Sequence, residues 1–199
     1  MIHILTRDIT LISDDEYRVG FYEMSPERQK KCLAYRFDDD RKRCIAADIL
    51  LRDMLSQLLS CDRHSLEFGI MNGGKPYLIG NAAYFGIAHS GRYVAVGVSK
   101  THEVGIDIER IRPVNVSLMR AFCTEKDMAF ILGADENITE EKITDEQTLN
   151  RFFRVWCFKE AYFKRTGEGI APAKMLSVSY LEHPKHEEIF DGYILTVVE

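Results

Sequence analysis

The hexapeptide 104–109, Val-Gly-Ile-Asp-Ile-Glu, alternates strictly between apolar residues and others, and this alternation constrains the local fold most. It is typical of a half-buried β-strand with one apolar face. Side chains two positions apart on a strand lie on the same face, about 7 Å apart, so Asp107 and Glu109 project together. Paired carboxylates repel unless a cation or a proton lies between them, and oxygen ligands of this kind suit Mg²⁺. The stretch predicts either a magnesium site or a solvated strand edge with two surface acids.

The composition narrows the classes of protein to which the chain can belong. With 199 residues, of which 46% are hydrophobic and 29% charged, it can form one large domain or two small ones. A net charge of −5 argues against a general nucleic-acid binder, so we expect no nucleic-acid partner. No stretch approaches the roughly 18 apolar residues of a membrane span, and Arg7 and Asp8 interrupt the N-terminal apolar run, unlike a signal peptide. We therefore expect no membrane partner.

The cysteines bear on the cellular compartment. Their number, five, is odd and they include no Cys-x-x-Cys pair, so neither a disulfide framework nor a zinc site is indicated. Because free thiols fit a reducing cytosol, we expect a cytoplasmic protein.

A basic island lies in the first quarter of the chain. Between residues 27 and 43 the sequence holds seven Lys or Arg and four acids. Ser25-Pro26-Glu27 has the signature of a helix start, and we expect this helix to end near Phe37. Asp38 to Asp40 can cap a second helix running to about Ser60. Basic side chains near helix N-termini form an anion site, and the alternative is an ordinary solvated helix face.

The rest of the first half predicts a turn and short strands. Asn72 to Pro76 is a turn signal that carries Lys75. Residues 84–87 and 93–98 are typical of strands, with 88–91, Ala-His-Ser-Gly, as their connection. His89 and Ser90 would then lie at a strand end, where a histidine is either a catalyst or an ordinary hydrogen-bonding residue. A further strand is expected at Ile2 to Leu5.

One long helix dominates the second half, from about Glu146 to Thr166, and Gly167 ends it. Glu160 fills a gap in its apolar stripe, and a carboxylate there is costly to bury without a partner. Lys164 lies one turn further on the same side, so the two residues form either part of a site or a surface ion pair. The apolar stripe comprises Leu149, Phe153, Trp156 and Phe163.

Shorter elements complete the second half. We expect a helix at 117–122 and another after Thr124-Glu125-Lys126-Asp127, which has the spacing of a capping box. The acidic residues of 133–147 predict an exposed turn. Strands are expected at Leu176 to Leu181 and at Tyr193 to Val198. The order helix, helix, strands thus occurs twice, which predicts two similar lobes.

Gly105-Ile106-Asp107-Ile108-Glu109 and the later segment 156–164, Trp-Cys-Phe-Lys-Glu-Ala-Tyr-Phe-Lys, form a pair of motifs. The pair resembles the signature of 4′-phosphopantetheinyl transferases, (V/I)G(I/V)D(I/V)E followed by W-x-x-K-E-A/S-x-x-K. The resemblance extends over nearly the whole chain, including Gly74-Lys75-Pro76 and residues 85–91. It is strongest to the pseudo-dimeric, surfactin-synthetase-activating type.

This resemblance implies an α+β fold of two similar lobes related by a pseudo-twofold, each a small sheet packed with helices. The N-terminal lobe would comprise residues 1–100, and the C-terminal lobe, 101–199, would carry the metal motif. Larger relatives continue beyond the position of Glu199 with another strand, so we expect a less covered second lobe. Two lobes in one chain make a monomer sufficient.

The resemblance also implies roles for individual residues. Asp107, Glu109 and Glu160 would bind Mg²⁺, which in this family also binds the diphosphate of coenzyme A. Lys164 would meet the phosphates. The other implied contacts to coenzyme A are Arg28, Lys31 and Arg43 at the 3′-phosphate, Lys75 near the adenine and phosphates, His89 with Ser90, and Lys159.

The implied reaction moves the phosphopantetheine arm of coenzyme A onto a serine of an apo acyl or peptidyl carrier protein and releases 3′,5′-ADP. Glu160 is the candidate base for the serine proton, a role that competes with metal binding. The family implies a docking surface for the carrier near residues 112–125. The carrier can serve fatty acid, polyketide or nonribosomal peptide biosynthesis.

Two other classes of function stay open. One is a module that holds coenzyme A or a carrier without turnover, which is favoured by Ala88 where the family often has serine. The other is a Mg²⁺-dependent phosphohydrolase that would use the same acids to activate water.

Overall fold

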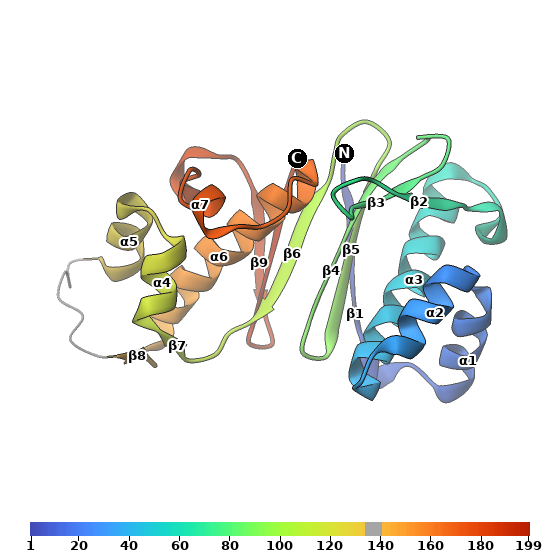
Figure 1. Ribbon diagram of the computed structural model, residues 1–199, viewed down its shortest axis with the longest axis horizontal. Helices are drawn as coiled ribbons and strands as arrows, with labels where there is room; N and C mark the ends of the chain where they lie inside the picture. Colours follow the sequence, from blue (N-terminus) through green and yellow to red (C-terminus); the bar gives the residue numbers. More distant parts are fainter. Residues whose placement is uncertain (134–140) are drawn as a thin grey trace. The chain divides into compact units, whose positions relative to one another are not determined.

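The computed structural model describes residues 1–133 and 141–199, which form two compact units, 1–104 and 105–199 (Figure 1). Each unit has its own cluster of buried apolar side chains. The expected lobe boundary at residue 100 and the pseudo-twofold between the lobes stay predictions. Of the acidic segment 133–147, Asp135, Glu136 and Glu140 lie outside the described residues.

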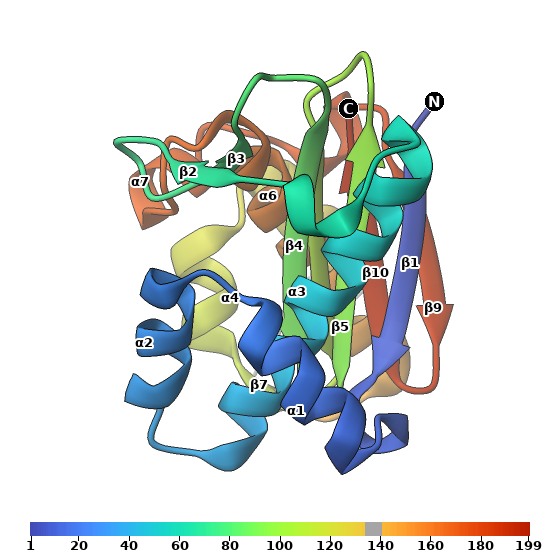
Figure 2. The same ribbon diagram turned by 90° about the vertical axis from the view of Figure 1, so that its right-hand side faces the viewer.

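Unit 1 is built on a three-stranded antiparallel sheet in the order β1-β5-β4. The long helix α3 lies across this sheet and packs chiefly on β5 (Figure 2). The strands are β1 (His3–Asp8), β4 (Tyr84–Ser90) and β5 (Tyr93–Ser99), with a separate hairpin of β2 (Phe68–Ile70) and β3 (Pro76–Leu78). The helices are α1 (Asp14–Glu23), α2 (Pro26–Ala34) and α3 (Asp38–Leu59), with short 3₁₀ turns at Ile9–Leu11 and Arg63–Ser65.

The helix starts in unit 1 follow from capping chemistry. The Ser25 hydroxyl accepts from the backbone N–H of Arg28, so the predicted start of α2 is confirmed. The sequence analysis did not predict α1, although Ser13 caps this helix and three acidic residues lie in its first turn. The expected capping of α3 by Asp38 to Asp40 is wrong. Phe37 is the N-cap without a side-chain bond, and the three acids lie in the first turn, where they complement the helix dipole.

Unit 2 repeats the strand order of unit 1. Its antiparallel sheet runs β6-β10-β9, so the first strand again pairs with the last, and the long helix α6 packs on β6 and β10. The strands are β6 (Gly105–Arg110), β9 (His186–Phe190) and β10 (Tyr193–Val198), with a small pair of β7 (Val114–Asn115) and β8 (Lys142–Ile143). The helices are α4 (Val116–Phe122), α5 (Glu125–Leu132), α6 (Glu146–Thr166) and α7 (Pro172–Met175), with a 3₁₀ turn at Tyr180–Glu182. The predicted α+β class with two similar units is confirmed.

Two strand predictions are wrong. Residues 176–181 form no strand but leave α7 and enter the 3₁₀ turn. Val178 and Tyr180 are nevertheless buried in the apolar cluster of unit 2. Their apolar character therefore reflects packing in this cluster and not pairing in a sheet. Residues 88–90, expected as a connection, are the last three residues of β4, and they pair with β5.

The long helix of unit 2 matches its prediction closely. Asp145 caps its start, and Gly167 ends it in the left-handed conformation. Leu149, Phe153 and Phe163 are buried as expected, whereas Trp156 is only half-buried.

α6 approaches β6 very closely at Gly105. A Cβ atom built on this glycine would lie 2.0 Å from the carbonyl oxygen of Ala161 and 2.8 Å from Cβ of Arg165. The missing side chain therefore sets the distance between helix and strand, and with it the reach of every α6 side chain toward β6.

We predict that Gly105→Ala lowers the free energy of unfolding by about 3 kcal/mol, because the added methyl group meets helix backbone that cannot move aside alone. Urea denaturation measures this change. As a control, Gly80→Ala places its methyl group in open space at φ +89° and should cost only about 1 kcal/mol of backbone strain. Equal losses in the two variants would contradict a tight contact at Gly105.

Candidate functional site

Asp107 lies on a strand that is covered on both faces. Val104, Ile106 and Ile108 are fully buried, but Asp107 on the opposite face is itself only 2% exposed. Gly105, two positions earlier on that face, touches α6. The alternative of a solvated strand edge is therefore wrong for Asp107, and its carboxylate needs a partner inside unit 2.

Lys164 of α6 is that partner. Its ammonium lies 2.5 Å from Oδ1 of Asp107, although the two residues are 57 positions apart in the chain, and 3.2 Å from Oε2 of Glu160 one helical turn earlier. A single cation thus bridges two carboxylates from β6 and α6. The sequence correctly placed Glu160 and Lys164 on the same side of the helix.

Burial and the neighbouring charges both shift pKa values in this cluster, where two carboxylates face one ammonium. Burial raises the pKa of Asp107 to about 7; the Lys164 ammonium opposes this rise, and the charges of Glu160 and Glu109 add to it. Burial lowers the pKa of Lys164, but the attraction of Asp107 and Glu160 outweighs it and lifts the pKa above its ordinary range. The raised pKa of Asp107 favours its protonated form, and the raised pKa of Lys164 keeps the ammonium charged.

Glu109 has a different partner from the other two acids. Its Oε2 atom lies 3.3 Å from Nη1 of Arg112, at the end of β6. Within residues 1–133 and 141–199, no group of three His, Cys, Asp or Glu side chains is spaced to hold a metal ion. The structure therefore brings Asp107 and Glu160 together around Lys164, whereas Glu109 turns to Arg112.

Among the residues that the structure describes, two buried oxygen atoms beside this cluster complete no hydrogen bond by distance and angle, although the Cys157 thiol interacts with Asp107. One is Oδ2 of Asp107, and the other is the hydroxyl of Thr196. Thr196 is the cross-strand neighbour of Asp107 in β10, so the two side chains share a face of the sheet. Oxygen atoms that are buried and unpaired are suitable ligands for a hard cation or for its water.

Lys159 does not belong to this cluster, and its expected contact with coenzyme A is wrong. The side chain is fully buried. Its ammonium donates to the carbonyl oxygens of Phe122 and Met175, at 2.8 and 2.7 Å, and lies 2.7 Å from Oδ2 of Asp127. These three contacts use all three hydrogens of the ammonium, so none is left for a phosphate.

Asp127 is a residue whose main role the sequence did not reveal. Its capping box at the start of α5 was predicted and is confirmed. The structure adds hydrogen bonds from Ser179 and from the backbone N–H of Tyr180, together with the pair to Lys159. Burial opposes its ionisation, but these bonds outweigh burial and lower the pKa of Asp127. Asp127 therefore ties α5, α6 and the segment after α7 to one another.

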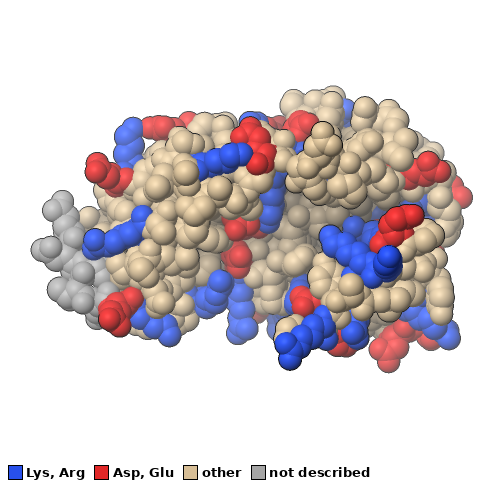
Figure 3. Space-filling model, in the orientation of Figure 1, with Lys and Arg blue, Asp and Glu red and all other residues tan. Residues whose placement is uncertain are grey.

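The basic residues expected at coenzyme A lie around α2 and the start of α3. Figure 3 shows Lys and Arg side chains gathered over α2. Arg28 lies 2.7 Å from a carboxylate oxygen of Asp48, while Lys31 is exposed on the same helix. Arg43 donates to Asp40 and, from Nη1 at 2.5 Å, to the carbonyl oxygen of Gly91.

Arg43 thus reaches the turn that follows His89 and Ser90 at the end of β4. Lys75, between β3 and its turn, pairs with Glu103 at 2.6 Å. Within unit 1 the structure therefore brings Arg43 to the His89–Ser90 end of β4. Lys75 instead forms an ion pair with Glu103.

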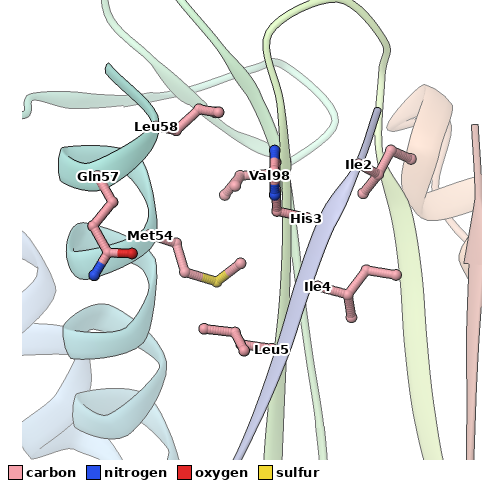
Figure 4. Close-up of a pocket in the computed structure, with 8 residues that line it drawn as sticks. All are labelled: Ile2, His3, Ile4, Leu5, Met54, Gln57, Leu58 and Val98. Carbon is pink, nitrogen blue, oxygen red and sulfur yellow. The ribbon is translucent and has the colours of Figure 1, made fainter. Parts of the chain in front are cut away.

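A pocket of about 630 Å³ between α3 and β1 contains none of these residues (Figure 4). Figure 4 shows Leu5, Met54 and Val98 directed toward one another. Its lining is mostly apolar and comprises Ile2, His3, Ile4, Leu5, Met54, Gln57, Leu58 and Val98. It has no charged group to hold a diphosphate, so we do not assign the candidate site to it.

Comparison with known proteins identifies the family of the chain. A family model described as the 4′-phosphopantetheinyl transferase superfamily matches residues 103–191, and one described as 4′-phosphopantetheinyl transferase, N-terminal, matches residues 12–101. The transferase Sfp of Bacillus subtilis (strain 168) is 30% identical over 161 residues, which cover 80% of this chain and 67% of Sfp. The chain belongs to this family.

Other phosphopantetheinyl transferases match more of the chain. HetI of Nostoc sp. (strain PCC 7120) is 28% identical over 191 residues, covering 86% of this chain and 77% of HetI. The protein gsp of Aneurinibacillus migulanus is 27% identical over 185 residues, covering 85% and 73%. Among the residues that the structure describes, no helix of this phosphopantetheinyl transferase combines the length and the apolar character needed to cross a bilayer.

We predict that Asp127→Asn lowers the free energy of unfolding by about 3–5 kcal/mol at neutral pH, because it leaves the Lys159 ammonium buried without a counter-charge. The folded-state pKa of Asp127 lies below its ordinary value of 3.8. Its stabilising effect is therefore complete above that value and is lost as the pH falls through the folded-state pKa. Chemical denaturation at several pH values should show the two proteins converging in acid.

The matched control is Glu182→Gln, which removes an exposed carboxylate paired with Lys126. It should leave the free energy of unfolding nearly unchanged, because exposed ion pairs contribute little to stability. A similar small loss for Asp127→Asn would mean that the buried pair contributes no net stability.

Proposed function

We propose that this chain transfers the 4′-phosphopantetheine arm of coenzyme A to a serine of an apo acyl or peptidyl carrier protein, and that the transfer depends on Mg²⁺. Membership of the phosphopantetheinyl transferase family supports the activity. The observation that carries the metal assignment is the convergence of Asp107 and Glu160 on one ammonium, from two different elements of unit 2.

The residues of this cluster fit a magnesium ion. All the available ligands are oxygen atoms, as Mg²⁺ requires. The Lys164 ammonium already occupies the position of a cation between the two carboxylates, and Oδ2 of Asp107 and the Thr196 hydroxyl have unused acceptor capacity. Asp107 and Glu160 would therefore hold the ion. Glu109 would join them only by leaving Arg112, with which it pairs in this structure.

Bound Mg²⁺ would neutralise the diphosphate of coenzyme A and so favour the departure of 3′,5′-ADP. Lys164, released from the carboxylates, would donate to a phosphate oxygen. The serine oxygen forms the new P–O bond as the bond to 3′,5′-ADP breaks, and the serine proton must pass to a base. Glu160 is our candidate for that base, in competition with its role as a ligand.

In unit 1, Arg28, Lys31 and Arg43 would bind the 3′-phosphate. Charge-assisted hydrogen bonds from guanidinium to phosphate are among the strongest in proteins, and Arg28 presents such a group on α2. Lys75, His89 and Ser90 would contact the remaining phosphates and the adenine. The carrier would dock near residues 112–125, which include α4. We further propose a cytoplasmic monomer.

We predict that Asp107→Asn and Glu160→Gln each reduce carrier modification by about a hundredfold or more, because the metal contributes several kcal/mol of charge stabilisation. Intact-mass analysis of an apo carrier incubated with coenzyme A and Mg²⁺ measures this. Mg²⁺ with coenzyme A should also raise the melting temperature of the unmodified protein but not of these variants.

Glu188→Gln serves as the control, since Glu188 is an exposed acid on β9. Full transfer by the Asp107 and Glu160 variants would remove the metal assignment. Release of phosphate from coenzyme A without a carrier would instead indicate a phosphohydrolase, and binding of coenzyme A without any turnover would indicate a binding module.

We predict that Arg28→Gln combined with Lys31→Gln raises KM for coenzyme A by about tenfold or more but leaves KM for dephospho-coenzyme A nearly unchanged, because only the first carries the 3′-phosphate. Steady-state kinetics with both substrates checks this. Lys30→Gln, on the same helix, is the control and should affect neither. Equal changes for both substrates would mean that Arg28 and Lys31 do not read the 3′-phosphate.

A further inference from the structure

A buried aspartate in unit 1 lies between two guanidinium groups. Asp48 of α3 is 1% exposed. Its Oδ2 atom accepts a hydrogen bond from Nε of Arg52 at 2.8 Å, and its Oδ1 atom lies 2.7 Å from Nε of Arg28. An ionised carboxylate in such a place is stable because it is paired on both sides.

Arg52 fixes the position of this carboxylate. Its Nη1 atom donates to the carbonyl oxygens of Arg63 and Leu66, each at 3.1 Å. Its guanidinium carbon lies 5.1 Å from the centre of the Phe68 ring. With these bonds the Arg52 side chain is occupied within the core, so it holds Asp48 but has no role toward a ligand.

Arg28 is held differently. Its backbone N–H donates to the Ser25 cap, and its side chain is 26% exposed. The contact to Asp48 uses only the Nε edge, and neither Nε of Arg28 nor Oδ1 of Asp48 completes a hydrogen bond. Within the described part of the chain, no residue accepts a hydrogen bond from its two terminal nitrogens. Asp48 therefore attracts the guanidinium without using the edge that recognises phosphate.

The charges of this group sum to one excess positive charge, carried by two arginines and one carboxylate. A carboxylate at the surface beside Arg28 would repel a phosphate, whereas Asp48 lies beneath the guanidinium on α3. The arrangement keeps the cation oriented and leaves its outer face electrostatically suited to an anion.

We propose that Asp48 is a positioning residue for recognition of the 3′-phosphate of coenzyme A, acting through Arg28. The proposal rests on the proposed function, because it assumes that Arg28 meets that phosphate. Asp48 does not touch the ligand. It orients the guanidinium so that a bidentate contact needs no further ordering of a long side chain.

The test compares KM for coenzyme A with KM for dephospho-coenzyme A in Asp48→Asn. We expect KM for coenzyme A to rise roughly tenfold while KM for dephospho-coenzyme A stays nearly constant, so the preference for the 3′-phosphate falls by the same factor. A carboxylate that only stabilised the core would change both substrates alike. The matched control is Asp53→Asn on the same helix, whose carboxylate is 41% exposed and pairs with Arg63; its preference should not change.

Asp48→Asn also leaves two buried guanidiniums with reduced compensation, and it can fail to fold. Asp48→Glu keeps the charge and moves the carboxylate by one methylene. If Asp48→Asn is unfolded, the same comparison of KM values in Asp48→Glu tests the proposal. An unchanged preference in a folded Asp48 variant overturns the proposal.

Arg28→Gln separates the positioning role of Asp48 from the assignment of Arg28 to the 3′-phosphate. If it abolishes the preference and the Asp48 variants do not, the positioning role is wrong and the proposed function stands. If Arg28→Gln itself leaves the preference unchanged, the assignment of Arg28 to the 3′-phosphate fails first.

Discussion

The contact between α6 and β6 is the constraint on which unit 2 depends. Gly105 has no side chain, so the helix backbone at Ala161 lies directly against the strand. The helix is then close enough for Lys164 to reach Asp107. Burial of Asp107 by the same contact raises its pKa and makes a positive partner necessary. The close approach thus creates both the site and its demand for a cation.

The strand order alone does not produce a cluster like that of Asp107, Glu160 and Lys164, because unit 1 has the same strand order but no such cluster among its residues. Asp8 pairs with Tyr93 in unit 1 as Arg110 pairs with Tyr193 in unit 2, so Leu5 holds the place of Asp107. The helix α3 packs chiefly on β5 rather than on the first strand, and an apolar pocket lies beside Leu5. Unit 1 instead presents its charged groups on α2 and at the N-terminal end of α3.

The sequence predicts local structure well where short-range chemistry determines it. The caps at Ser25 and Thr124 and the glycine at 167 fixed helix ends, and the alternation at 104–109 fixed a strand. Prediction failed where burial came from distant parts of the chain. Residues 176–181 were predicted as a strand but form none, and the sequence around Lys159 gave no local sign that its ammonium is buried against Asp127. The pairing of Asp107 with Lys164 likewise follows from tertiary packing, and the sequence did not predict it.

Three buried aspartates show how the same side chain takes structural and functional roles. Both oxygens of Asp127 are bonded, to Ser179 and the Tyr180 N–H on one side and to Lys159 and the Thr124 N–H on the other, so it has no capacity for a ligand. Asp107 has a free Oδ2, and Asp48 contacts Arg28 without a completed hydrogen bond. A buried polar atom that completes no hydrogen bond lowers stability, and among the described residues Oδ2 of Asp107 and Oδ1 of Asp48 are such atoms. Asp127 therefore has a structural role alone, whereas Asp107 and Asp48 each contact a cationic side chain of the proposed site, Lys164 and Arg28.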